Sequence, residues 1–130
     1  MTKKQRELLT DAQLLLMGIL WEKGRATVHQ VKDSLPKDRP LAYTTVMTTL
    51  RYLEWKGYIR HDVDDRTYVY YPVVSREEVV QSALCHIADR VFHGSAELLM
   101  ATFLQKQKLG PEKLKKLKEL ISAKEKEAKK

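Results

Sequence analysis

The sequence has 130 residues, of which 43% are hydrophobic and 32% charged, a composition typical of a soluble globular protein that buries its own core. Because no apolar run reaches the roughly 18 residues that span a bilayer, and no apolar segment follows the basic residues 1–6, we expect a cytoplasmic protein without membrane insertion. A single cysteine, Cys85, excludes an intrachain disulfide. The net charge of +7 favours nucleic acid as a partner, although the basic excess is spread evenly, with 12 Lys and Arg against 9 Asp and Glu in residues 1–74 and 12 against 8 in residues 75–130.

The first half of the chain carries the signals of three helices. A capping box at residues 10–13 predicts a helix that runs to Lys23, where Gly24 ends it. The same pattern, starting at Thr27, opens a short helix that ends by Pro36. After a polar connector, a third helix is predicted from about residue 43 to residue 56, and the glycine that follows closes it.

The apolar pattern then changes to the period of a β-strand. Residues 58–63 and 67–71 alternate apolar and polar side chains, and the polar residues 64–66 lie between them as a turn, which together predict a β-hairpin. The order helix, helix, helix, hairpin is typical of a winged helix-turn-helix. The expected fold class is therefore mainly α with a small β-hairpin, in which residues 1–74 form an N-terminal winged-helix DNA-binding domain.

The second half, residues 75–130, is predicted to be helical, with helices over about 76–92, 95–107 and 111–122. The tail after Ser122 alternates Lys and Glu, and we expect it to fray. Three short helices bury little surface alone, so their apolar stripes favour a dimerisation region that packs against a second copy, with folding back onto the chain's own winged helix as the alternative. The residues expected at this interface are Leu84, Ile87, Val91, Leu98, Leu99, Phe103, Leu114, Leu117 and Ile121.

The third helix has two faces of different chemistry. Val46, Leu50 and Leu53 recur at helical spacing and predict the buried face. The other face carries hydroxyl, methyl and guanidinium groups, which bind base edges, thymine methyls and phosphates in a major groove. Threonine is a mediocre helix former, so four threonines in six residues favour this role over a merely solvated face. The predicted DNA-binding residues of this helix are Tyr43, Thr44, Thr45, Met47, Thr48 and Arg51.

The hairpin offers a further candidate contact at its turn. Arg66 is placed at the tip of the wing, where its guanidinium can bind a phosphate. The alternative is a solvated turn, since Asp62, Asp64 and Asp65 nearby would repel a phosphate. For the tyrosines of residues 68–71, packing within the sheet is favoured over stacking on bases.

Several stretches resemble the penicillinase-repressor family of bacterial transcription regulators, the BlaI/MecI/CopY type. The resemblance extends over about residues 8–121, and its most specific part is the start of the third helix. The matching stretches are residues 9–13 (LTDAQ), 20–24 (LWEKG), 41–50 (LAYTTVMTTL), 56–58 (KGY), 68–70 (YVY) with Pro72, and 74–78 (VSREE).

The resemblance implies an N-terminal winged helix, a C-terminal dimerisation region, and a homodimer that represses an adjacent gene from a palindromic double-stranded DNA operator. In the β-lactam-responsive members, a membrane sensor triggers proteolysis between an Asn and a Phe, and this cleavage releases the operator. Thr102 and Phe103 occupy the matching positions, and the Asn is absent. A sensor or protease is thus an implied partner. The C-terminal cysteine cluster of the copper-responsive members is also absent.

Three other functions compete with transcriptional repression. Cys85, Asp89 and His93 are spaced four residues apart and could chelate a soft cation, but a small buried cysteine and a helical pair explain them better, and no cofactor is expected. A protein-binding adaptor would carry more aliphatic or aromatic groups than the third helix does. An enzyme is not predicted either, because the histidines and carboxylates form no recognisable catalytic motif.

Overall fold

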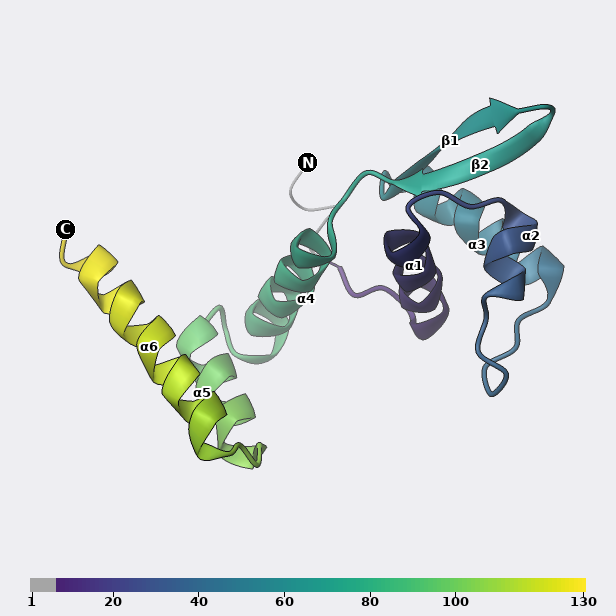
Figure 1. The fold of residues 1–130 in the computed structure, drawn as a ribbon. Helices are drawn as coiled ribbons and strands as arrows, with labels where there is room; N and C mark the ends of the chain where they lie inside the picture. The colour runs from purple at the N-terminus through teal and green to yellow at the C-terminus, as the bar shows by residue number, and fades with distance from the viewer. Residues whose placement is uncertain (1–6) are drawn as a thin grey trace. The chain divides into compact units, whose positions relative to one another are not determined.

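Six helices and one hairpin make up residues 7–130, the part of the chain that the computed structural model describes (Figure 1). The chain divides into two compact units, one ending at Gly94 and one comprising residues 95–130. The expected fold class, mainly α with one small β-hairpin, is confirmed. In chain order the elements are α1 (Asp11–Lys23), α2 (Val28–Asp33), α3 (Tyr43–Trp55), β1 (Ile59–Asp64), β2 (Thr67–Pro72), α4 (Arg76–Val91), α5 (Ala96–Lys106) and α6 (Pro111–Ala128).

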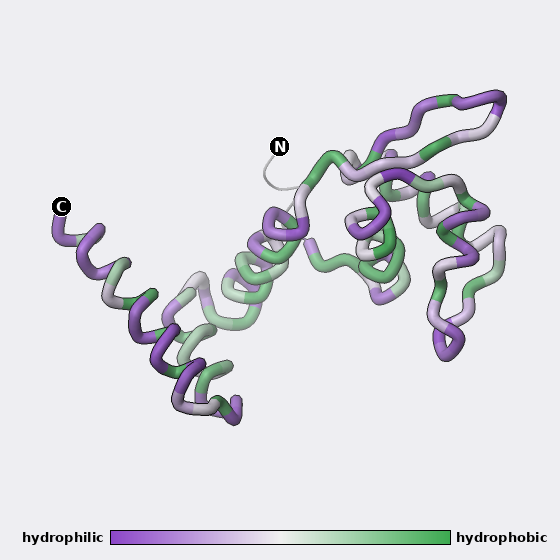
Figure 2. Tube along the Cα trace, in the orientation of Figure 1, coloured by the Kyte–Doolittle hydropathy of each residue, from purple (hydrophilic) through white to green (hydrophobic). Residues whose placement is uncertain are grey.

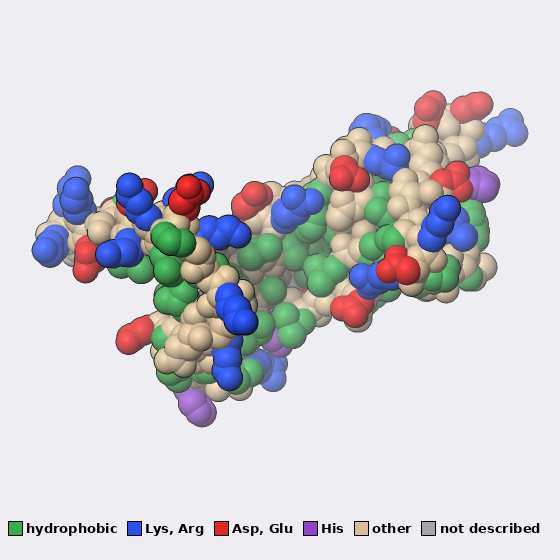
Figure 3. Space-filling view, turned by 60° about the horizontal axis from the view of Figure 1, so that its bottom comes forward, with side chains coloured by type: hydrophobic (Ala, Val, Ile, Leu, Met, Phe, Trp, Pro, Cys, Tyr) green, Lys and Arg blue, Asp and Glu red, His purple; other side chains and the backbone are tan. Residues whose placement is uncertain are grey.

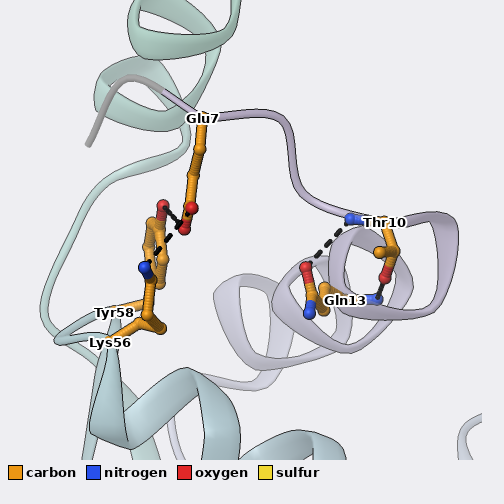
Figure 4. A network of polar contacts seen from close by, with 5 residues as sticks. All are labelled: Glu7, Thr10, Gln13, Lys56 and Tyr58. Carbon is orange, nitrogen blue, oxygen red and sulfur yellow. Dashed lines mark hydrogen bonds and ion pairs between the residues drawn. The ribbon is translucent and has the colours of Figure 1, made fainter. Parts of the chain in front are cut away.

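Local hydrogen bonds define the ends of the first helices. The Thr10 hydroxyl accepts a hydrogen bond from the backbone N–H of Gln13, whose side chain accepts one in return from the Thr10 backbone N–H (Figure 4). Thr27 and Gln30 form the same capping box at the start of α2. Both satisfy amide groups that the first helical turn leaves unpaired. At the other end of α1, Gly24 adopts φ 84°, a conformation that glycine reaches without strain.

The core of the first unit lies where α1, α2, α3 and the hairpin meet. Helix α1, largely hydrophobic in Figure 2, supplies Leu16, Met17 and Leu20, which are all fully buried. The predicted buried face of α3 is confirmed, since Val46, Leu50 and Leu53 have no exposed surface. Burying each such side chain stabilises the fold by about 1.5–3 kcal/mol, which fixes the rotation of α3 and therefore the face it turns outward.

The hairpin pairs β1 and β2 in an antiparallel register, with Ile59 opposite Pro72 and Asp64 opposite Thr67. Its two-residue turn places Asp65 and Arg66 at positive φ, as the twist of a tight hairpin requires. Residue 26 adds a single antiparallel bridge to β2, so that the hairpin is joined to the loop before α2. Figure 1 shows the hairpin lying along one side of α1, α2 and α3.

Helix α4 begins against the winged-helix core. A third capping box, formed by Ser75 and Glu78, starts it. Val79 is buried in the same cluster as α1 and α3, and the Trp21 indole N–H donates a hydrogen bond of 2.9 Å to the carbonyl oxygen of Val74. The first turns of α4 therefore belong to the compact unit that ends at Gly94.

Helices α5 and α6 form the second unit and bury no residue in the single chain. Hydrophobic side chains remain visible at the molecular surface in Figure 3, and Phe103 and Ile121 are 65% and 57% exposed. Helix α6 continues beyond the predicted end near residue 122 to Ala128, so the tail is helical there, and its fraying stays a prediction. Lys, Glu and Ala are good helix formers and, at three- and four-residue spacings, Glu and Lys attract each other.

Across residues 7–130, no helix combines the length and the apolar character needed to cross a membrane.

Candidate nucleic-acid interface

The outward face of α3 carries the residues that the sequence predicts for DNA binding. Thr44, Thr45, Thr48 and Arg51 are exposed, while Met47 is half-buried beside them. These side chains are turned away from the buried face because the leucines and valine of that face fill the core. The helix thus offers hydroxyl, methyl and guanidinium groups to solvent from one rigid element.

A hollow of about 400 Å³ lies between α3, the start of α2 and the hairpin. It brings together Tyr43, Met47 and Arg51 from α3 with Arg66 from the tip of the hairpin. Thr44, Thr45 and Thr48 are exposed on α3 but do not line it. The complete lining consists of Thr27, Val28, His29, Tyr43, Met47, Arg51, Arg66, Thr67, Tyr68 and Tyr70.

Several polar residues of this hollow are not among the predicted DNA-binding residues. The sequence predicts Thr27 only as the start of α2 and Tyr68 only as part of the sheet, and no sequence signal points to His29. The His29 ring contacts the Tyr43 ring edge-on, with 5.5 Å between their centroids. Thr27 and His29 lie at the start of α2 and Tyr68 lies on β2, and only the packing of α2 and the hairpin against α3 brings them together.

The hairpin separates its charges by face. Asp62 accepts a 2.6 Å hydrogen bond from Arg25, whose guanidinium lies 4.9 Å from the centre of the Tyr71 ring. Both contacts lie on the face of the hairpin opposite to the one that carries His61. Asp62 thus has a cationic partner at the surface, while Asp64, Asp65 and Arg66 stay exposed near the tip.

The other face of the hairpin is tied to α3. Both carboxylate oxygens of Glu54 lie within hydrogen-bond distance of His61 Nδ1, at 2.7 and 2.8 Å. The His61 ring stacks on Tyr68, with 3.8 Å between centroids and an interplanar angle of 12°. Tyr70 is buried, and burial followed by the negative charge of Glu54 raises the pKa of its hydroxyl.

The residues predicted for dimerisation are largely exposed in the single chain. Val91, Leu98 and Phe103 are 63%, 50% and 65% exposed, whereas Ile87 and Leu99 are half-buried. The remaining members, exposed on α4 and α6, are Leu84, Leu114, Leu117 and Ile121. Thr102, which precedes Phe103 in the predicted cleavage position, is also exposed within α5.

Within residues 7–130, no three or more His, Cys, Asp or Glu side chains are arranged to hold a metal ion, so the spacing of Cys85, Asp89 and His93 does not produce a metal site there. Cys85 is half-buried and carries a free thiol.

A helix-turn-helix followed by a two-stranded wing, with hydroxyl groups and arginine on its outward helix, defines a winged-helix protein of the DNA-binding class. The sequence matches the family model of the penicillinase repressor over residues 9–123. The chain belongs to this family, whose members are winged-helix, DNA-binding transcriptional repressors.

Individual relatives agree with this assignment. The transcriptional regulator BlaI of Mycobacterium tuberculosis is 36% identical over 109 residues, covering 70% of this chain and 79% of that protein. The penicillinase repressor of Bacillus licheniformis is 23% identical over 113 residues, covering 87% of this chain and 88% of that protein. Among solved structures, the YusO protein of Bacillus subtilis has a TM-score of 0.50 at 19% identity, covers 98% of this chain and 80% of its own, and shares the fold alone.

Proposed function

We propose that this protein represses transcription by binding a palindromic double-stranded DNA operator as a homodimer, with α3 in the major groove. The observation that carries the proposal is the outward face of α3 together with the hollow that joins it to the wing. Thr44, Thr48 and Arg51 offer groups that bind base edges. Arg66 lines the same hollow from the hairpin, where its guanidinium would bind a phosphate.

The helix entrance supports the same orientation. Tyr43 is 42% exposed at the start of α3, where backbone N–H groups and the helix dipole favour a phosphate. Ala42, the N-cap residue, offers no side chain to satisfy those amides. Thr45 and Met47 complete the set of α3 residues that we place at the DNA.

The homodimer is supported by the apolar side chains that one chain leaves exposed. Helices α5 and α6 bury none of their residues, and apolar stripes of this length are stable in water when a second copy covers them. We assign residues 75–130 to dimerisation and residues 1–74 to DNA binding, with α4 joining the two through Val79. Two linked half-sites then raise operator affinity far above that of one.

Release of the operator follows from this arrangement. A signal that separates the two copies would weaken DNA binding without altering α3 or the wing. Thr102 and Phe103 occupy the family's cleavage position, so we propose that a sensor or protease acts on the dimerisation region there. We place the protein in the cytoplasm, where its operator is.

Selection of binding sites from a random DNA pool tests the function. We expect the full chain to select an inverted repeat whose half-sites lie about one DNA turn, ~34 Å, or a multiple of it apart. Thr48→Ala should change the preferred bases, because it removes a hydroxyl and a methyl from the groove face.

An unpaired half-site, or a monomer in sedimentation at micromolar concentration, would contradict the homodimer. If Thr48→Ala left affinity and base preference unchanged, the assigned face of α3 would be wrong. If the pool yielded no preferred sequence at all, the outward face of α3 would serve another partner.

A further inference from the structure

The hairpin is held firmly at its base but not at its tip. Ile59, at the base, and Tyr70, which pairs with His61 midway along the hairpin, are buried in the core. Further along the same face of β1, Val63 is 62% exposed, and Arg66 at the turn is exposed as well. A two-stranded hairpin is marginally stable by itself, so the position of its tip depends on side-chain contacts between base and turn.

One such contact lies midway along the hairpin. His61 is two residues from Ile59 toward the turn, and its Nδ1 lies 2.7 and 2.8 Å from the two carboxylate oxygens of Glu54, on the last full turn of α3. Tyr68 on β2 stacks on the His61 ring, nearly parallel to it, with 3.8 Å between the ring centroids. Glu54, His61 and Tyr68 thus connect the recognition helix to both strands.

The residues of this contact are partly shielded from water. The side chains of His61 and Glu54 are 26% and 29% exposed, so their hydrogen bond competes less with solvent than a surface ion pair does. The charged and titratable groups around it are Arg51 on α3 and Tyr68 and Tyr70 on β2. Tyr68 and Arg51 both line the hollow that also holds Arg66.

We propose that Glu54 and His61 are positioning residues for DNA binding, which fix the angle of the hairpin against α3 so that Arg66 and the α3 face meet the same DNA. The proposal rests on the DNA binding proposed above and names the contact that aligns α3 with the hairpin. Neither side chain is assigned a contact with DNA.

The role of Glu54 is testable because charge repulsion and positioning predict opposite changes in DNA affinity when the carboxylate is removed. A carboxylate on a recognition helix repels phosphates, so its removal should tighten DNA binding if charge were its only effect. If Glu54 positions the wing, its removal should weaken binding despite the lost repulsion. An isosteric amide separates the two effects, since glutamine is neutral and still pairs with either tautomer of histidine.

The experiment measures fluorescence anisotropy of the full-length protein with a labelled DNA duplex carrying the inverted repeat obtained by selection. We expect Glu54→Ala to weaken binding by about tenfold, the size of one lost charge-assisted hydrogen bond. Glu54→Gln should bind at least as tightly as the unmodified protein. Glu54→Ala should cost nothing further in a chain that already carries Arg66→Ala, because the position of an absent side chain no longer matters.

Amide hydrogen exchange of β1 and β2 without DNA gives an independent readout of the same contact. Faster exchange in the outer half of the hairpin is expected for Glu54→Ala, with protection restored in Glu54→Gln and an unchanged core. Equal tightening of DNA binding by both substitutions, or unchanged exchange in Glu54→Ala, overturns the positioning role. Failure of the unmodified protein to bind the duplex would instead refute the proposed function, while the exchange result would still decide whether Glu54 holds the wing.

Discussion

At the scale of single residues, the turn of the hairpin combines backbone strain with exposed charge. Asp65 and Arg66 adopt φ 50° and 68°, a region that L-residues other than glycine, asparagine and aspartate rarely occupy. A turn chosen for stability alone would carry glycine in the second position. The arginine there is therefore better explained by a contact its side chain makes than by the conformation of its backbone.

Arg66→Gly should accordingly move stability and DNA binding in opposite directions. Relief of the positive φ should raise the free energy of unfolding by about 0.5–1 kcal/mol, after the larger freedom of glycine in the unfolded chain is deducted. Loss of the guanidinium should weaken binding to all sequences about equally and lower the salt slope by about one unit. Urea unfolding and anisotropy at several salt concentrations measure the two effects.

Asp65→Gly is the matched control, because it places glycine at the neighbouring positive-φ position, which aspartate already tolerates, and removes a negative charge. It should change the stability of the fold little while tightening DNA binding. A loss of affinity in both variants would show that the shape of the turn, and not the Arg66 charge, determines binding.

The sequence predicts the outward face of α3 well but not the hollow beside it. The spacing of Val46, Leu50 and Leu53 fixes the buried face and hence the opposite one, which is a purely local argument. His29 and Tyr68 reach the hollow through tertiary packing, for which the periodicity of α2 and β2 gives no sign. The contact between Glu54 and His61 has the same origin, since it spans the turn at Gly57.

At the scale of elements, the helix starts are the most predictable feature. Thr10, Thr27 and Ser75 each form the expected capping box, because the signal and the structure lie within the same four residues. The end of α6 is less predictable. The helix continues past its predicted end near residue 122 to Ala128, because the Lys, Glu and Ala residues that follow have high helix propensity.

A polar network joins the segment before α1 to the turn after α3. The Tyr58 hydroxyl donates a hydrogen bond of 3.4 Å to Glu7, whose second oxygen lies 3.4 Å from Lys56 Nζ (Figure 4). Tyr58 is 4% exposed, and burial, followed by the nearby Glu7 charge, raises its pKa from 10.0 to about 12. The folded chain therefore holds this proton more tightly than the unfolded chain does.

Stability should consequently fall in alkaline solution through Tyr58. Its contribution is complete below pH 10, where the hydroxyl is protonated in both states, and is lost as the pH rises from 10 toward 12. The loss amounts to up to about 2 kcal/mol. Tyr58→Phe has no proton to lose, so its stability should decline less over this range. Urea unfolding between pH 8 and pH 11 measures the difference, and parallel curves for the two proteins would show that Tyr58 titrates normally.

At the scale of the whole molecule, the two compact units differ in how they bury apolar surface. The unit that ends at Gly94 has a continuous core, whereas the unit of residues 95–130 has none in a single chain. The predicted boundary after residue 74 separates the proposed functions, and the compact units separate later because Val79 packs into the first core. Sequence alone identifies the apolar stripes of α5 and α6, which the proposed second copy would cover.

Phe103→Asp tests that dependence at the position matching the family's cleavage site. Phe103 is 65% exposed in the single chain, so an aspartate there should leave the fold of one chain intact. In a homodimer the same aspartate would be a buried charge without a partner, which is strongly unfavourable. We expect dimerisation and operator affinity to fall together, because the second half-site then loses its high effective concentration. Sedimentation and anisotropy measure both, and Gln105→Asp, which adds the same charge two residues away on α5, should change neither. A Phe103→Asp chain that remains a dimer with full operator affinity would exclude release of DNA through this position.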